Sequence, residues 1–505
     1  MTETSHATPQ ARVKTPHPFL ALMGLYLGGF VGMYSETALN IALPQLSAAF
    51  GIELSLVQWL VIGYMLAIGI VLPFASAIMK WFSARAITMF ALGSFALGAV
   101  ASGIAPNFGL ALAGRIVQGV GTGLVLPLMF AMVLEVMPPH KIGAAMGITA
   151  LVIMFAPAIG PTLAGFLIGA LSWRWVFFSF AAVALVGLAF AAKFEVNPYT
   201  LSRPHIDAAS VVASCLGFGG IVLCVGVSSL LGWTSPVTLG AFVVGVAGLV
   251  VYVRRQLSSE TPVLDLRAFR IRDFRIGSLC VMVNFGITLA AMYILPQFYQ
   301  NAMAIAVVVT GVVMLPGGVV NCLVSVVSGR LFDHVGARVP AIAGFALSAV
   351  GAAMLLFVSP DSSIGYVVAC HIVLMVGVPL AMSPCQTHAL SSLPARLSTD
   401  GSTILNTMQQ VVGAICTAVA TGLIANGQQS YFAAGGADAT LAFSQGAHAG
   451  FLFVFALAAC GLILSIRLKT PSKQAERAEA ACEVQPVLSA SRGSQAARIA
   501  QTENR

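Results

Sequence analysis

The stretch GMYSETALNIALPQ (residues 32–45) contains a carboxylic acid, Glu36, which follows fifteen positions that are almost all hydrophobic. Its last four residues, ALPQ, return as ILPQ at 294–297, an offset of 252 residues. The lone acid indicates a membrane span that carries a functional group, and the repeat indicates a duplicated architecture. The rest of the sequence supports both interpretations.

The composition is that of a polytopic α-helical membrane protein. Of the 505 residues, 58% are hydrophobic and 8% are charged, against about 25% charged in a soluble domain. Apolar segments of about 20 residues recur, the length that crosses a hydrocarbon core about 30 Å thick as a helix. We expect an all-α fold of fourteen spans, at 18–44, 55–79, 86–104, 108–136, 144–169, 174–193, 208–230, 236–254, 275–297, 305–328, 339–358, 364–390, 402–425 and 449–467.

The positive charges predict the orientation of these spans. If the first segment is inside, 23 of the 25 Lys and Arg fall in inside segments, six of them between residues 254 and 275. Cytoplasmic loops carry such an excess, so both termini are expected in the cytoplasm. The net charge of +8 lies in short loops and tails, which argues against a nucleic-acid partner. The first span is expected to remain as an uncleaved signal anchor.

Two further matches extend the repeat. SAIMKWFSAR (76–85) aligns with GRLFDHVGAR (329–338), and RIVQGVG (115–121) aligns with HIVLMVG (371–377). Two six-helix halves in the same orientation are a recurring plan in transporters, with two inserted helices joining them here. The expected organisation is a cytoplasmic N-terminal tail, an N-terminal half, a linker with spans 7 and 8, a C-terminal half and a disordered cytoplasmic tail, at 1–17, 18–193, 194–274, 275–467 and 468–505 respectively. Residues 427–450 are expected to form an outside loop.

Three ionisable residues inside the spans are candidates for proton coupling. Glu36 is expensive to place in hydrocarbon, and burial favours the neutral form of a carboxyl group, so it could bind and release a proton. Arg115 lies at a similar depth and is expected to be its neighbour. The repeat maps Arg115 onto His371, whose imidazole could titrate in the physiological range. A structural glutamate and a hydrogen-bonded packing histidine remain the alternatives.

Polar and adaptable side chains at helical spacing predict a substrate cavity between the halves. Polar stripes face a bundle interior or water rather than lipid, and Met and aromatic surfaces suit loose recognition of apolar cargo. Plain packing is the alternative for the apolar members. The candidates are Phe30, Met33, Tyr34, Asn40, Gln118, Thr122, Asn406 and Gln410.

The segment APAIGPTLAG (156–165) predicts a kinked and closely packed helix. Pro157 and Pro161 each remove a backbone hydrogen bond, while Gly160 and Gly165 permit close helix approach. Because the equivalent stretch of the second half has no proline, this segment could form a gate or a seal against leakage. A packed kink without a dynamic role is the alternative.

The loop GRLFDHVGAR predicts a conformational latch between two helices. Its candidate gating residues are Gly329, Asp333, the turn glycine Gly336, and Arg338. Asp333 can lie near a helix terminus or pair with basic loop residues. The equivalent loop of the first half has Lys80 in place of the aspartate, so the latch is expected in the second half.

Several kinds of chemistry lack their sequence signatures. No GxxxxGK[ST], HExxH or GxSxG motif occurs, which argues against ATP-driven transport and against an enzyme. The nine cysteines show no CxxC spacing, so no metal site, no disulfide and no cofactor are expected.

These motifs together resemble the 14-span drug:proton antiporters of the major facilitator superfamily, of the EmrB/QacA type. The resemblance rests on SETALNIALP, VQWLVIGYML (57–66), RIVQGVG, APAIGPTLAG with WRWVFF (173–178), and GRLFDHVGAR, and it covers residues 18–467. GSTILNTMQQVVGA (401–414) resembles the lincomycin-resistance-like branch. Two departures are Lys80, where the family has an aspartate, and Ser-Phe at 179–180 in place of Ile-Asn.

The resemblance implies the roles of particular residues. Glu36 and Arg115 would act in proton coupling, Gly160 and Pro161 in the antiporter motif, and Asp333 with Arg338 in the loop latch. The implied fold is two six-helix halves of the major facilitator type plus two linker helices.

The implied function is proton-coupled efflux of lipophilic, including cationic, drugs by alternating access, from a bacterial cytoplasmic (inner) membrane. The partners would be a small-molecule substrate, protons and the lipid bilayer, and a periplasmic adaptor protein is left open. The alternatives are a dedicated exporter of one endogenous metabolite and a non-transporting membrane sensor or scaffold.

Overall fold

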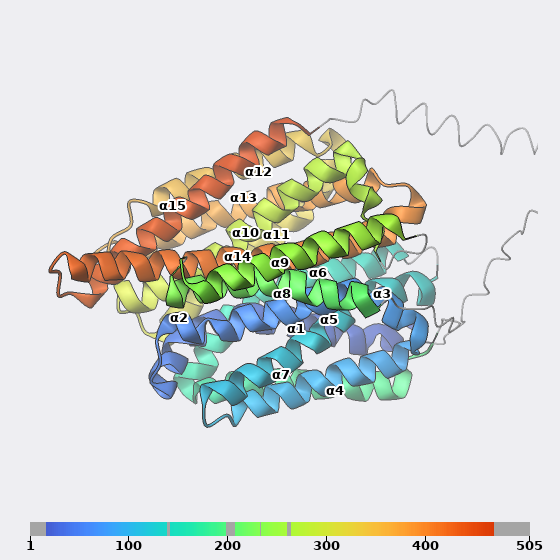
Figure 1. The fold of residues 1–505 in the computed structure, drawn as a ribbon, viewed down its shortest axis with the longest axis horizontal. Helices are drawn as coiled ribbons and strands as arrows, with labels where there is room; N and C mark the ends of the chain where they lie inside the picture. The colour runs from blue at the N-terminus through green and yellow to red at the C-terminus, as the bar shows by residue number, and fades with distance from the viewer. Residues whose placement is uncertain (1–16, 139–141, 198–207, 233, 260–263, 469–505) are drawn as a thin grey trace, which may run out of the picture.

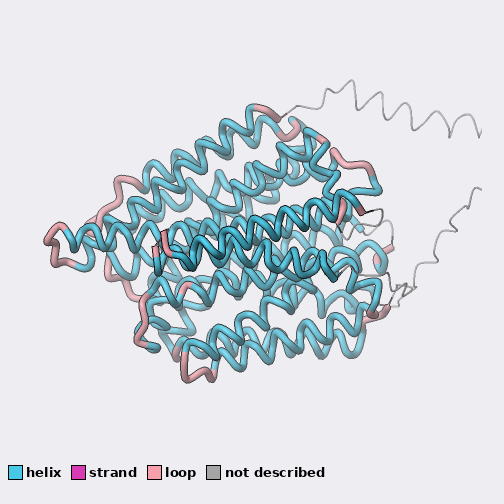
Figure 2. Tube along the Cα trace, in the orientation of Figure 1, coloured by secondary structure: helices cyan, strands magenta, loops and turns pink. Residues whose placement is uncertain are grey.

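The computed structural model describes residues 17–138, 142–197, 208–232, 234–259 and 264–468, and this part of the chain is helical without any strand. Long helices run side by side in one bundle (Figures 1 and 2). Fourteen helices in the described part are long and apolar enough to cross a membrane, which confirms the predicted number. The chain is a multi-pass membrane protein.

The helices fall into two packed groups with a pair between them. The first group contains α1 (Pro18–Phe50), α2 (Leu54–Val57), α3 (Trp59–Trp81), α4 (Ala84–Gly103), α5 (Phe108–Val136), α6 (Ile142–Ala170) and α7 (Trp173–Phe194). The pair is α8 (Ala208–Leu231) and α9 (Pro236–Ser258), followed by the short helix η2 (Leu266–Arg270). The second group contains α10 (Arg272–Gln297), η3 (Phe298–Ala302), α11 (Val307–Val335), α12 (Arg338–Leu355), α13 (Ile364–Ser391), α14 (Ala395–Ala433) and α15 (Ala439–Ile466).

The duplication seen in the sequence is visible in the packing of equivalent helices. In the first group, a methyl group added at Gly121 of α5 would lie 2.4 Å from the carbonyl oxygen of Ala91 in α4. In the second group, one added at Gly377 of α13 would lie 2.5 Å from the carbonyl oxygen of Gly344 in α12. Small residues let membrane helices approach closely, and here the repeat offsets place the two contacts at matching positions.

The two groups meet along three helix pairs. α6 packs against α11, α3 against α14, and α1 against α10. The first of these contacts is backbone to backbone, because Gly165 of α6 faces Gly311 of α11. Thr162 strengthens it by donating a hydrogen bond of 2.8 Å from its hydroxyl to the carbonyl oxygen of Gly311.

The expected loop at 427–450 was wrong. α14 continues to Ala433 and α15 begins at Ala439, so the turn between them is five residues long. The glycines permit a close helix crossing rather than a loop: a methyl group at Gly427 would lie 2.4 Å from the Cα atom of Gly446. Asp438 caps α15 by accepting hydrogen bonds from the backbone amides of Thr440 and Leu441, which fixes where that helix begins.

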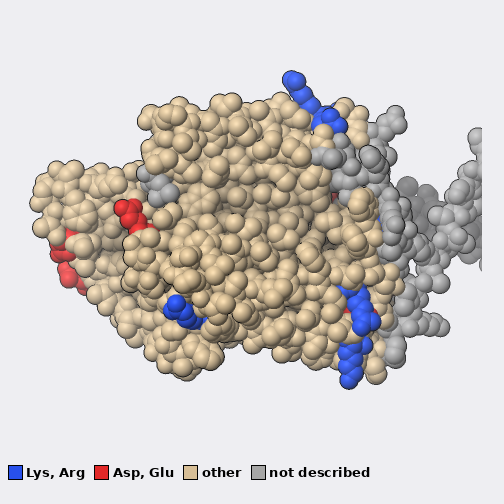
Figure 3. All heavy atoms as spheres, turned by 60° about the horizontal axis from the view of Figure 1, so that its bottom comes forward, with Lys and Arg blue, Asp and Glu red and all other residues tan. Residues whose placement is uncertain are grey.

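The charged side chains divide the bundle into two ends and a neutral middle. We call the arginine-rich end the one at which Lys80, Arg85, Lys193, Arg254 and Arg338 lie, and the far end the opposite one. On the face shown in Figure 3, Lys and Arg gather mostly at one end, while the middle carries neither sign of charge. Such a belt suits a hydrocarbon surrounding.

Candidate coupling and substrate site

α1 carries Glu36 into the middle of the molecule. The residue is 18 positions from Pro18 and 14 from Phe50, which places it about 27 Å and 21 Å from the two helix ends. Its side chain is 3% exposed, and its Oε2 atom has no hydrogen-bond partner. A carboxyl group so placed is costly unless a nearby charge or a function compensates.

The direct partner of Glu36 comes from the other half of the molecule. The side chain of Gln410, on α14, lies within hydrogen-bonding reach of the Glu36 carboxyl group. Gln410 is itself 5% exposed, and its Oε1 atom has no partner, so the amide nitrogen is the group that donates. The Glu36 carboxyl group therefore lies at the contact between the two halves.

Arg115 lies close to Glu36 but does not form an ion pair with it. The two side chains attract each other electrostatically, yet the described residues include no salt bridge that joins them. The guanidinium is fully buried and is held by five polar contacts. Its nitrogens donate to Ser35 Oγ (3.1 Å), Ser35 O (3.4 Å), Gln118 Oε1 (2.8 Å) and Leu60 O (3.0 Å), and its carbon Cζ lies 4.0 Å from the centre of the Tyr64 ring.

Tyr64 ties this polar cluster together. Its hydroxyl group lies 2.8 Å from the hydroxyl of Thr122 and donates to the carbonyl oxygen of Gly32 at 2.9 Å. Gln118 adds a bond of 3.4 Å to Ser102. The predicted polar stripe of α5, Arg115 with Gln118 and Thr122, thus forms one network with α1 and α3. Such a network holds the arginine in one orientation beside Glu36.

The far end holds a second polar cluster that sequence reasoning missed. Gln297 donates to the backbone carbonyl oxygen of Asn40 at 2.8 Å, and Gln45 donates to Gln300 at 2.9 Å. Gln300 also donates to the carbonyl oxygen of Ile41 at 3.2 Å. We call these five residues the amide clasp. Gln45 and Gln297 are the final residues of the two repeated motifs, so the duplication joins the halves at this point.

The segment 156–165 of α6 contacts both α1 and α11. A methyl group at Gly160 would lie 2.5 Å from the Thr37 hydroxyl of α1, one residue beyond Glu36. The carbonyl oxygen of Pro161 faces Gly311, and a methyl group at Gly165 would lie 2.8 Å from the carbonyl oxygen of Val307. Pro157 lies inside the same helix. Close packing along this segment was predicted from its glycines, and its gating role remains a prediction.

The apolar members of the predicted cavity lie on α1 at the first half's own interface. Tyr34 is fully buried, its hydroxyl lies 3.0 Å from Ser179, and its ring packs edge-on against Phe180 at 4.8 Å. Phe30 stacks on Tyr34 at 6.0 Å, and Met33 is buried. The Ser-Phe pair that departs from the family pattern therefore serves to hold Tyr34.

His371 and Asn406 are not part of the Glu36 cluster. His371 is fully buried in α13, neither ring nitrogen has a hydrogen-bond partner, and its ring presses on Gly317 of α11. Asn406 lies half-buried on α14, one turn before Gln410. Asn40 is buried in α1 with its side-chain oxygen unpaired. Their predicted roles in proton coupling and substrate binding remain predictions.

The predicted gating loop is a tight connection between α11 and α12. Gly336 has a φ angle of 71°, which confirms it as the turn glycine because side chains disfavour that region. Arg338 is exposed at the first position of α12, and Gly329 lies inside α11. The side chain of Asp333 lies outside what the structure describes, so the latch remains a prediction.

Two site residues that the sequence analysis did not predict could have been found from their positions in the sequence. Tyr64 belongs to the VQWLVIGYML segment, and Ser35 precedes Glu36 directly. Gln300 could not, because only the folded chain brings η3 next to α1.

Comparisons with known proteins identify the family. A model of the Major Facilitator Superfamily matches residues 25–417. The chain belongs to the Major Facilitator Superfamily. It is therefore a membrane transporter of small molecules and not an enzyme.

Relatives within this superfamily are named for drug resistance. The chain is 39% identical over 458 residues to the lincomycin resistance protein LmrB of Listeria monocytogenes, which covers 90% of this chain and 97% of that protein. It is 39% identical over 457 residues to LmrB of Bacillus subtilis, covering 89% and 95%. It is 26% identical over 407 residues to the multidrug resistance protein Stp of Mycobacterium tuberculosis, covering 80% and 76%.

Solved structures share the fold at low sequence identity. The human organic anion transporter MFSD10 aligns with a TM-score of 0.59 at 14% identity, over 89% of this chain and all of that one. A POT family transporter in complex with 5-aminolevulinic acid aligns with a TM-score of 0.63 at 14% identity, over 88% and 94%. These similarities support the fold alone.

Proposed function

We propose that this superfamily member is a proton-driven exporter of lipophilic drugs, including lincosamides and cationic compounds, in a bacterial cytoplasmic membrane. The observation that carries the coupling is the buried Glu36, which faces Arg115 within its own half and lies within hydrogen-bonding reach of Gln410 of the other half. The resistance proteins LmrB and Stp support the substrate class. The excess of Lys and Arg supports a cytoplasmic arginine-rich end and cytoplasmic termini.

Proton binding at Glu36 changes the contact between the halves. When the carboxyl group is ionised, it accepts a charge-assisted hydrogen bond from Gln410, about twice as strong as a neutral one. A proton removes that charge and with it the attraction to Arg115. Because Gln410 lies on the opposite half, the protonation state of Glu36 biases how tightly the halves hold together.

The cycle that follows exchanges a proton for cargo. With the far end closed, Glu36 releases its proton to the cytoplasm and cargo enters the space between the halves. With the far end open, a proton from outside neutralises Glu36 and cargo leaves. A membrane potential of 100 mV contributes about 2.3 kcal/mol for each charge that moves across it.

Alternating access requires contacts that seal the far end and can separate. The amide clasp and the Gly165–Gly311 contact supply them: both join the two halves, and neither contains an ionised group. In this proposal residues 18–193 and 275–467 move as two bodies, with the linker of 194–274 between them. The segment from Pro157 to Gly165 acts as the seal.

The test compares wild type with Glu36→Gln in an efflux-deficient bacterial host, with equal amounts in the membrane. The matched control is Glu53→Gln, which neutralises an exposed carboxyl group at the far end. We expect wild type and the control to confer resistance to lincosamides and lipophilic dyes, and Glu36→Gln to confer none. An uncoupler that collapses the proton gradient should abolish dye export by wild type.

Each other outcome has a defined meaning. Full resistance with Glu36→Gln would exclude this carboxyl as the essential proton site. Export that withstands the uncoupler would exclude proton coupling. Absence of resistance with wild type would overturn the multidrug proposal in favour of an exporter dedicated to one metabolite.

A further inference from the structure

The linker pair α8 and α9 is locked together through glycines. A methyl group at Gly220 of α8 would lie 2.5 Å from the Cα atom of Gly245 in α9, and one at Gly248 would lie 2.5 Å from the backbone nitrogen of Gly217. Helices that approach so closely leave little room for rearrangement between them. The surface that they form together is therefore a fixed one.

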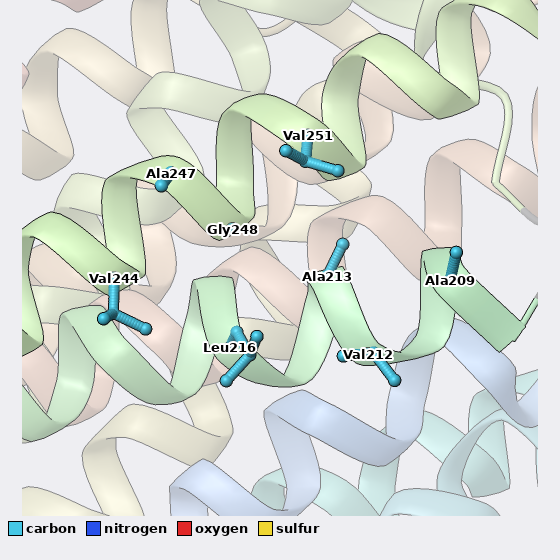
Figure 4. A pocket seen from close by; sticks show the side chains of 8 residues that line it. All are labelled: Ala209, Val212, Ala213, Leu216, Val244, Ala247, Gly248 and Val251. Carbon is cyan, nitrogen blue, oxygen red and sulfur yellow. The ribbon is translucent and has the colours of Figure 1, made fainter.

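This fixed surface contains an apolar groove. Small residues line its floor and longer aliphatic side chains its edges, and together they enclose about 630 Å³ (Figure 4). That volume falls within the range of small-ligand sites, about 300–1,000 Å³. Four edge residues are about half exposed, so the groove opens toward the surroundings of the bundle and not into its core: Val212 (56%), Leu216 (49%), Val244 (45%) and Val251 (48%).

The groove runs to the arginine-rich end and meets positive charge there. Ala209, the second residue of α8, and Val251 of α9 line it at that end. Arg254 follows Val251 by three positions, so it lies on the same face of α9, and it is exposed. The groove therefore ends next to a positively charged side chain, near the end of the apolar part of α9.

Further arginines lie at the same end of the bundle. Gln256 of α9 donates to Ser210 of α8 at 3.0 Å and accepts from the backbone amide of Leu264 at 3.2 Å, which holds the segment before η2 against the pair. η2 touches α9 and presents Arg267 and Arg270 as exposed side chains. Between residues 254 and 275 the sequence has six arginines and three acidic residues, one of which, Asp265, lies 3.9 Å from Arg267.

We propose that the groove between α8 and α9 binds an acyl chain of an anionic phospholipid, whose phosphate is held by Arg254. The apolar groove suits the acyl chain of such a lipid, and the positive charge at the end of the groove suits its phosphate. Basic residues next to a membrane helix attract anionic headgroups. A zwitterionic lipid would supply the chain without the net charge, and free phosphate would supply the charge without the chain.

This site lies on a helix that packs against both halves of the proposed transporter. α8 packs against α3 of one half and against α14 of the other, and α14 carries Gln410. A lipid that stabilises the linker pair therefore contacts a linker helix that touches both halves. This consequence for transport rests on the proposed function, whereas binding of the lipid does not.

The test is lipid binding by the purified full-length protein, followed by native mass spectrometry. Phosphatidylglycerol and phosphatidylcholine with identical chains are titrated separately. We expect phosphatidylglycerol to bind at least about fivefold more tightly, and Arg254→Gln to weaken it by about fivefold, the effect of roughly one surface charge. Val251→Trp, which fills the groove, should remove the tight binding. Inorganic phosphate at millimolar concentration should not compete.

A matched control separates the groove from the helix surface. Val243→Trp introduces the same ring at a position of α9 that is 63% exposed and does not line the groove, and it should bind phosphatidylglycerol as wild type does. Equal binding of the two lipids, or unchanged binding by Val251→Trp, would overturn the proposal. Competition by phosphate alone would assign the site to a free anion. None of these results depends on whether the protein exports drugs.

Discussion

A single glutamine, Gln410, places the buried carboxyl group of Glu36 at the contact between the two halves. Depth in the membrane pairs Glu36 with Arg115, but the guanidinium is already held by Ser35, Leu60 and Gln118. The Glu36 carboxyl group is thus attracted by the positive charge of Arg115 in its own half, and it lies within hydrogen-bonding reach of Gln410 across the interface. An ion pair within one half would have left the contact between the halves independent of protonation.

Glu195 is a second buried carboxyl group, placed just after α7 and beyond its apolar span. It is 5% exposed and accepts a hydrogen bond of 2.7 Å from Thr88 of α4, while its Oε2 atom has no partner. Burial raises the pKa of Glu195 to about 7, although the bond from Thr88 and the charge of Arg85 oppose that shift. Nearby, Arg85 donates to the carbonyl oxygen of Ala192.

This raised pKa predicts that the α4–α7 contact weakens as pH rises. The folded protein binds the proton more tightly than the unfolded chain, so stability is highest below about pH 4.5, falls as pH rises toward 7, and stays lower above. A shift from 4.5 to about 7 corresponds to at most about 3 kcal/mol. Glu195→Gln removes the charge, so we expect its unfolding temperature to exceed that of wild type by about 2–4 °C at pH 8.

Thermal unfolding of the purified protein, followed by tryptophan fluorescence at pH 5 and pH 8, measures this difference. Glu53→Gln, at an exposed carboxyl group, is the control and should shift neither value. An equal gain for Glu195→Gln at both pH values would show that the charge of Glu195 is not the cause.

At the scale of the helix, the pairing of α6 with α11 depends on the absence of side chains. Gly165 and Gly311 bring the two backbones together, and the hydrogen bond from Thr162 to Gly311 forms only at that distance. Two prolines, Pro157 and Pro161, lie inside α6, and proline is a common cause of helix kinks. The α6–α11 contact therefore depends on several positions along both helices and not on a single residue.

We predict that Gly165→Val separates α6 from α11 at the far end. The added side chain would begin 2.8 Å from the carbonyl oxygen of Val307 and 3.0 Å from the Cα atom of Gly311, so the helices must move apart. Reconstituted vesicles should then leak protons without cargo at a rate at least several-fold above wild type, as reported by a pH-sensitive dye inside them.

The control for this prediction is Gly93→Val on α4. No atom lies within 4 Å of the methyl group that this change would add first, so the variant tests the general cost of valine for glycine in a helix. A leak of equal size in both variants, or no leak with Gly165→Val, would contradict a sealing role for the α6–α11 contact.

The helices were predictable because their signal is local. An apolar run of about 20 residues identifies a span wherever it occurs, and the fourteen predicted spans match the helices found. The prediction failed at 427–450, where Gly427 and Gly446 resemble loop residues in sequence but serve a helix crossing. Glycine occurs both in loops and where two helices cross closely, and only the presence of a neighbouring helix distinguishes the two cases.

At the scale of the whole molecule, the site was predictable only within each half. The network of Arg115, Gln118 and Thr122 follows from spacing on one helix, and Glu36 follows from its depth. The bond from Gln410 to Glu36 and the amide clasp join residues more than 250 positions apart. Their register depends on how the two halves meet, which no local pattern encodes.

The amide clasp gives the last prediction, since it is the far-end contact made by both repeat copies. Its hydrogen bonds run between neutral amides and backbone carbonyls, each contributing about 1 kcal/mol. We expect Gln45→Ala combined with Gln297→Ala to shift the protein toward a far-end-open state. Hydrogen–deuterium exchange should then rise severalfold in residues 41–52 and 296–305, and should stay unchanged at the arginine-rich end.

Because the clasp contains no titratable group, the gain in exchange should be the same at pH 6 and pH 8. The control is Gln429→Ala, which removes an exposed amide from α14 near the same end and should leave exchange unchanged. If exchange in the double variant rose only at one pH, the opening would be governed by an ionisable group such as Glu36. If it did not rise at all, the α6–α11 contact would be sufficient to hold the far end closed.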